Sequence, residues 1–242
     1  MKKLIVVITL MLISVILLRA DVYIKTQTHT PAMEMMGKKF PEKNMVSEQW
    51  LGNNKMAMIS ASQITVIDLS IKKVFFIYHD KKSYVETSLP LDMSKLLPAN
   101  IKGMAAMLKM TVKVSPTGQT KTINGRKCDG YNIEMKTAMM PIKSISWVTT
   151  DVPFDWKGYA EKMYATALAA VMPFVDEASL AELRKIQGIQ IAQESTMSMM
   201  GNEMKTTSEV VEMIEKPAPA GLYSVPAGYT KIDNLIMAMG MK

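Results

Sequence analysis

The chain has 242 residues, one cysteine and a formal net charge of +7. A single cysteine excludes an intrachain disulfide. The lysines are scattered in pairs at expected turns and form no clustered basic stripe, which is typical of a solvated surface and argues against nucleic-acid binding.

The first 20 residues have the layout of a secretory signal peptide. Lys2 and Lys3 precede an apolar run from Leu4 to Leu18, and Ala20 supplies a small residue at the exit. The run is at the short end for a bilayer-spanning helix, which needs about 20 residues. We therefore expect cleavage after Ala20 and a periplasmic or secreted mature chain, with an uncleaved anchor as the alternative. Residues 21–233 are predicted to form one β-rich domain, and residues 234–242 a C-terminal tail.

The first half of the domain is predicted to be an antiparallel meander. Segments rich in β-branched and aromatic residues alternate with short turns that contain Gly, Asn, Asp or Lys. Connections this short cannot cross over to make parallel pairs. The expected strands are 22–29, 45–51, 55–60, 64–69, 73–79 and 83–87.

Helices and further strands are predicted beyond residue 90. Apolar residues at helical spacing, including Met104 and Leu108, indicate a helix that packs on another element. Asn124-Gly125 is a strong hairpin signal, and a strand is expected over 142–152. A second helix is expected from about Asp155, and a third over 176–186.

The last hairpin is rich in methionine. A two-residue turn at Gly201-Asn202 would place Met199 opposite Met204, and strand alternation would put Met197, Met199 and Met204 on one face. Residues 21–242 contain 23 methionines and 12 leucines. Methionine is unbranched and is favoured where an apolar surface adapts to its partner. A covered hydrophobic core is the alternative interpretation.

We interpret this pattern as an adaptable apolar cavity. Trp50 is included in it, although a structural plug is an equal alternative for that side chain. Met104 and Leu108 are expected to form its lid. The predicted ligand-binding residues are Trp50, Met56, Met58, Met104, Leu108, Met197, Met199 and Met204.

The same thioethers suit Cu(I), so copper binding or oxidant buffering is an alternative function. Residues i and i+2 of a strand lie about 7 Å apart, too far to share an ion without a neighbouring strand. The sequence contains no catalytic or cofactor fingerprint, and His79 and Asp80 are adjacent, so their side chains diverge on a strand. We predict no enzyme activity, no catalytic residues, no cofactor and no assigned metal site.

Several segments, taken in order, resemble an uncharacterised family of exported bacterial proteins, a domain of unknown function that is similar to the LolA/LolB-like fold of periplasmic lipoprotein carriers. The segments that carry the resemblance are WLGNNKMAM (50–58), 64–86, 117–135, SWVTTDVP (146–153), 195–210 and 219–233. The resemblance implies a strongly curved antiparallel sheet, an incomplete barrel, with helices on its concave face around an apolar cavity. It supplies no catalytic residues and no ligand identity.

The expectation is therefore an α+β domain with two or three helices on a curved antiparallel sheet. It is expected to bind or carry a lipid, acyl chain or lipoprotein in the cell envelope, with at most transient membrane contact and no nucleic-acid partner. A structural or interaction module without a small ligand is a third alternative.

Overall fold

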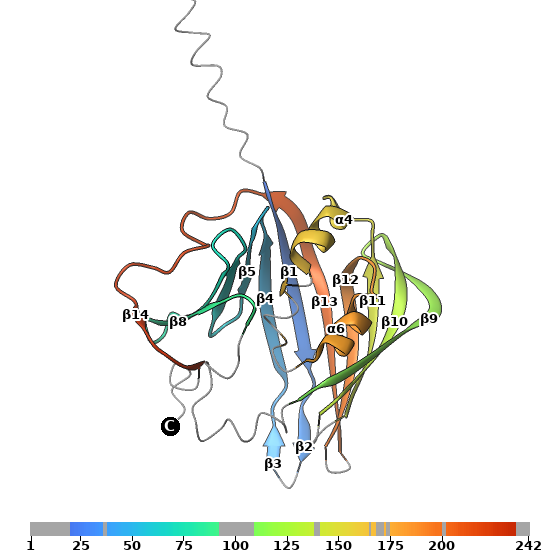
Figure 1. Ribbon diagram of the computed structural model, residues 1–242. Helices are drawn as coiled ribbons and strands as arrows, with labels where there is room; N and C mark the ends of the chain where they lie inside the picture. The colour runs from blue at the N-terminus through green and yellow to red at the C-terminus, as the bar shows by residue number, and fades with distance from the viewer. Residues whose placement is uncertain are drawn as a thin grey trace, which may run out of the picture.

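The computed structural model (Figure 1) describes residues 20–35, 38–91, 109–137, 141–164, 166–167, 172, 175–199 and 202–235. The predicted signal peptide, the predicted helix with Met104 and Leu108, and most of the predicted tail lie outside the described residues. No helix in the described part of the chain is long and apolar enough to cross a membrane.

One twelve-stranded sheet dominates the fold, in the order β14-β8-β7-β6-β5-β4-β1-β13-β12-β11-β10-β9. Neighbouring strands of this sheet run antiparallel, except that β14 runs parallel to β8. A two-stranded ribbon, β2-β3, lies beyond one end of β1 and β4 (Figure 1). The strands are β1 (Asp21–Thr30), β2 (Met33–Met35), β3 (Lys38–Phe40), β4 (Lys43–Leu51), β5 (Lys55–Ile59), β6 (Ile64–Asp68), β7 (Lys73–Tyr78), β8 (Ser83–Ser88), β9 (Thr111–Ile123), β10 (Arg126–Lys136), β11 (Pro141–Thr149), β12 (Ile189–Met199), β13 (Asn202–Lys216) and β14 (Thr230–Lys231).

The local turn chemistry explains the hairpins. The meander predicted from short connections is confirmed, because β4 to β8 pair consecutively and antiparallel. Asn124 and Gly125 both have positive φ, 51° and 75°, between the paired strands β9 and β10. This is the backbone that a two-residue hairpin turn requires and that Asn-Gly supplies at low cost.

The described helices are short and lie on one face of the sheet (Figure 1). They are α4 (Trp156–Tyr159), the π-helical turn η1 (Ala160–Tyr164) and α6 (Glu177–Leu183). Asp155 and Asp176 cap α4 and α6, accepting hydrogen bonds from the backbone N–H groups of Gly158 and Ser179. Both helix starts therefore agree with the predicted ones.

Helix α6 also covers the edge strand β9. The Ser179 hydroxyl accepts a hydrogen bond from Val112 N at 2.9 Å, and a Glu182 carboxylate oxygen accepts one from Val114 N at 3.0 Å. These bonds satisfy strand donors that an open edge would present to solvent or to another chain. In the described residues β9 and β14 do not pair, so the sheet is open.

The sheet has two differently covered faces. The inner face, which carries the helices, packs Ile24, Leu51, Met56 and Ile67 with Met163 and other apolar residues. The outer face packs Tyr23, Trp50, Ala57, Val66 and Ile77 under the C-terminal segment 218–229. The expected antiparallel, sheet-rich fold with few helices is confirmed.

Candidate ligand-binding site

A pocket of about 270 Å³ lies on the inner face between the sheet and the helical segment that begins at α4. We call it the helix pocket. Its walls are mainly apolar, with a polar side formed by hydroxyl and amide side chains. It is lined by Ile24, Thr26, Gln49, Leu51, Met56, Met58, Ser146, Tyr159, Ala167, Ile186, Gly188, Ile189, Gln190 and Val210.

Close contacts fix the walls of the helix pocket. The Tyr159 hydroxyl donates a hydrogen bond to the Met56 sulfur at 3.7 Å, and the Tyr159 ring meets Phe154 edge to face, with centroids 6.2 Å apart. Gly188 has φ +125°, and a Cβ there would lie 2.4 Å from the Thr149 carbonyl oxygen. Only glycine therefore allows the chain to enter β12 so close to β11.

A second apolar pocket, of about 380 Å³, lies at the other end of the same face, beside the β2-β3 ribbon. We call it the hairpin pocket. Met197 and Met204 lie directly opposite each other on β12 and β13, and Met33 and Phe40 come from the ribbon. The remaining lining residues are Thr30, Pro31, Pro41, Glu42, Lys43 and Asn202.

The predicted methionines thus share a face but occupy two pockets. Met56 and Met58 line the helix pocket, whereas Met197 and Met204 line the hairpin pocket. Ile24 and Thr30, one beside each pocket, are six residues apart on β1, which corresponds to roughly 20 Å. The expectation of a single continuous methionine-lined cavity is corrected accordingly.

The register of the last hairpin also differs from the expected one. Met199 lies opposite Asn202 and Met197 opposite Met204, two residues from the predicted pairing. A shift by two residues preserves the face of each position, so Met197 and Met204 remain together. Met104 and Leu108 lie outside the described residues, and so does the side chain of Met199.

Trp50 lies on the outer face, away from both pockets. It pairs with Ala57, whereas the neighbouring β4 residues Gln49 and Leu51 pair with Met58 and Met56. Its ring centroid is 4.7 Å from that of Tyr23, beneath the C-terminal segment. The expected grouping of Trp50 with the methionines is corrected, because successive residues of a strand point to opposite faces.

A band of uncharged polar side chains separates the two pockets on the inner face. The band was not predicted from the sequence, although its signal is present there: Thr26, Thr28 and Thr30 alternate along β1, as do Ser144 and Ser146 along β11. We call it the neutral belt. It comprises Thr26, Thr28, Ser47, Gln49, Ser144, Ser146, Gln190, Gln193, Ser195, Thr206 and Ser208.

The titratable residues of the described chain form no recognisable reaction centre. His79 Nδ1 lies 2.5 Å from the Tyr229 hydroxyl, and the two rings meet edge to face. His29 Nδ1 lies 3.0 Å from Asn44 Oδ1 on the exposed outer face. No group of three or more His, Cys, Asp and Glu residues in the described ranges is arranged to hold a metal ion.

Cys128 is fully buried, and burial raises the pKa of its thiol. Because the thiolate is the reactive form, we predict that the native protein reacts with Ellman's reagent at least about tenfold more slowly than the urea-unfolded protein at pH 8. The reaction is followed by absorbance, and the single cysteine makes the signal unambiguous. Equal rates in the two states would contradict the buried placement.

Comparison with known proteins places the chain in a family. Among solved structures, the chain is similar to the crystal structure described as a putative outer membrane lipoprotein-sorting protein domain from Vibrio parahaemolyticus. That similarity has 7% sequence identity and a TM-score of 0.29, and covers 83% of this chain and 87% of that one. No protein of curated function matches the sequence. Residues 23–229 match the family described as domain of unknown function DUF4412, so the chain belongs to this family.

Proposed function

We propose that this protein is a non-enzymatic, exported protein that binds an apolar ligand, a lipid or acyl chain, in the helix pocket. The observation that carries the proposal is the position of Met56 and Met58 in a partly open hollow between a sheet and a short helical segment. Export rests on the layout of residues 1–20.

The chemistry of the helix pocket suits reversible capture of an acyl chain. Burying about eight methylene groups at about 0.8 kcal/mol each would contribute about 6 kcal/mol before the costs of association. Flexible thioether side chains adapt to chains of different length and shape without exposing polar groups. A carrier must also release its ligand, which a moderate affinity allows.

Filling the pocket should weaken binding. Ala167 is buried at the helix pocket, and we expect Ala167→Leu to reduce the affinity for a fluorescent fatty acid by about tenfold or more, because the larger side chain occupies the ligand volume. Fluorescence titration measures the affinity, and thermal melting monitors folding.

Native mass spectrometry of protein purified from its own envelope is expected to reveal co-purifying lipid.

The matched control is Ala192→Leu, because Ala192 pairs with Glu209 on the outer face. The control is expected to keep the wild-type affinity. If Ala167→Leu is folded and binds the fatty acid as tightly as wild type, the helix pocket is not the binding site. If wild type binds no lipid in either assay, the proposed function is wrong.

Cu(I) binding at the hairpin pocket is a second candidate function. The cross-strand pair Met197 and Met204, together with Met33, supplies the neighbouring-strand thioethers that one strand by itself cannot offer. A Cu(I) titration against a competing chelator tests it. Stoichiometric uptake that is lost in Met197→Leu/Met204→Leu would support copper binding, and absence of uptake by wild type would exclude it.

A further inference from the structure

The neutral belt adjoins the helix pocket, where the head group of a bound acyl chain would lie. Thr26, Gln49, Ser146 and Gln190 line the helix pocket itself, so the belt begins where an acyl chain in that pocket would end. We propose that the belt binds an uncharged, hydroxyl-bearing head group, and that the ligand is a neutral acylglycerol. This inference rests on the proposed function, since the acyl chain would occupy the helix pocket.

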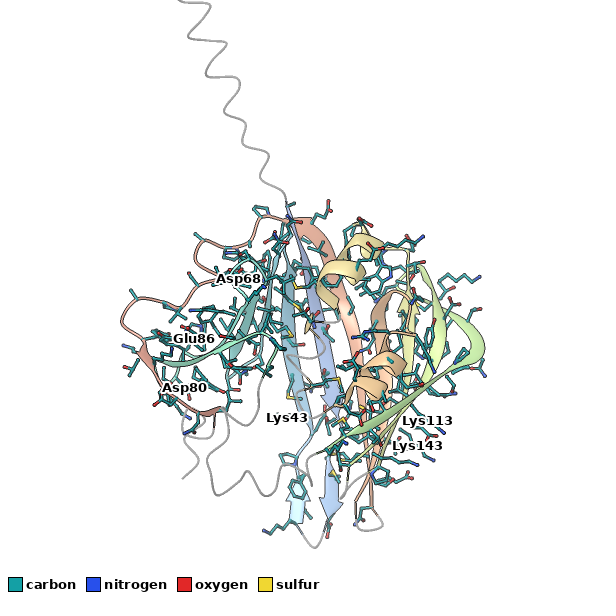
Figure 2. The ribbon with its side chains drawn as sticks, viewed as in Figure 1. Lys43, Asp68, Asp80, Glu86, Lys113 and Lys143 are labelled. Carbon is teal, nitrogen blue, oxygen red and sulfur yellow. The ribbon has the colours of Figure 1, made fainter. Side chains whose placement is uncertain are left out.

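The inner-face positions of the belt strands are uncharged, whereas the outer-face positions of the same strands carry charged residues. Along the same strands the outer face carries Lys25, Glu48, Lys143, Glu194 and Glu209, which occupy the alternate positions. Figure 2 shows Lys43, a charged residue of the hairpin pocket, at the far end of β4. Between the two pockets the described inner-face residues of β1, β4, β11, β12 and β13 are uncharged.

Part of the belt retains unused hydrogen-bonding capacity. Ser144 and Ser195 bond to each other at 2.8 Å, and the Ser146 hydroxyl donates to Gln190 at 2.9 Å. Thr26 and Thr28 are half-buried, and their side chains make no hydrogen bond within the described residues. Half-buried hydroxyls on a stretch of the inner face that carries no charge suit a neutral ligand that both donates and accepts.

Thr26 and Thr28 occupy successive inner-face positions of β1, about 7 Å apart. Thr26 pairs with Ser47 on one side and Val210 on the other, and Thr28 pairs with Ser208. Thr26 lines the helix pocket, and Thr28 lies one inner-face position farther along β1, with Ser208 beside it on β13. A glycerol head group attached to a chain in the pocket would meet Thr26 together with the other polar lining residues of the pocket, and Thr28 next.

The neutral belt is a poor binding site for a charged head group. A carboxylate or phosphate that enters a half-buried site loses hydration, and this loss is offset only by a paired cation or several donors. The belt supplies no cation among its described residues. The ester and hydroxyl groups of an acylglycerol instead exchange hydrogen bonds with water for hydrogen bonds with threonine, serine and glutamine side chains.

The test compares ligands that differ only in the head group. We expect the full mature chain to bind 1-monododecanoylglycerol at least about tenfold more tightly than dodecanoate or dodecyl phosphate, as measured by isothermal titration calorimetry below the critical micelle concentrations. Thr26→Val/Thr28→Val, which removes two hydroxyls at nearly constant shape, is expected to lose about five- to tenfold of the acylglycerol affinity. Binding of dodecanoate should change by less than about twofold in that variant.

Thr207→Val is the matched control, because Thr207 pairs with His29 on the outer face. It should bind all three ligands as wild type does. Equal or tighter binding of the anions, or an unchanged acylglycerol affinity in the folded double variant, overturns the head-group assignment and leaves the proposed function standing. Failure of all three ligands to bind wild type overturns both.

Discussion

Replacing Trp50 with alanine is expected to lower the free energy of unfolding by about 3–5 kcal/mol. The side chain is 4% exposed and packs with Tyr23, Ala57 and Val66 beneath the segment 218–229. Removing the indole leaves a large cavity between the sheet and this segment, which has only partial freedom to collapse into it. Urea unfolding followed by circular dichroism measures the loss.

Trp50→Phe separates stability from binding. The Trp50 Nε1–H has no hydrogen-bond partner in the described structure, so phenylalanine loses packing volume but no hydrogen bond. We expect a smaller loss of stability and an acyl affinity within about twofold of wild type, since Trp50 lies on the outer face. A Trp50→Phe protein with wild-type stability and no acyl binding would contradict this assignment and indicate that Trp50 contacts the ligand.

Asp68→Ala is expected to cost about 2–3 kcal/mol, because several charge-assisted hydrogen bonds converge on this carboxylate. Asp68 is 3% exposed, and Lys55 Nζ lies 2.9 Å from Oδ2. The backbone N–H and the hydroxyl of Ser70 both donate to Oδ1. Figure 2 shows Asp68 beside the meander strands and Asp80 at a more distant turn. Asp80→Ala, at an exposed turn, is the control with an expected change near zero.

The contribution of Asp68 should depend on pH. Burial disfavours its charged form, but the hydrogen bonds from Ser70 and Lys55 outweigh burial and lower the pKa of Asp68 below its ordinary value. A folded-state pKa below the unfolded one means that the stabilisation is complete above the unfolded value and is lost as pH falls through the folded one. The stability difference between wild type and Asp68→Asn should therefore shrink below about pH 4. A difference that is constant from pH 7 to pH 3 would contradict this assignment.

Local signals in the sequence predicted most of the elements. Asn124-Gly125 marked a hairpin, Asp155 and Asp176 marked helix starts, and short turns indicated the meander. Each of these signals acts within a few residues, because turn dihedrals and helix caps depend on neighbouring backbone and side chains. The neutral belt is present in the sequence as an alternation of threonine, serine and glutamine, but its members lie on five strands that only the tertiary structure brings side by side.

The sequence by itself determined which residues of a strand share a face, since that follows from the two-residue period of the extended chain. Only the tertiary structure decided which strands become neighbours: β1 pairs with both β4 and β13, although β13 follows it by some 180 residues. Such distant pairing depends on the packing of the whole sheet and on bulges at Lys25/Thr26 and Trp147/Val148, none of which a local pattern specifies. Met56 and Met204 therefore share a face, as alternation requires, but lie at opposite ends of it, and Trp50 lies behind both.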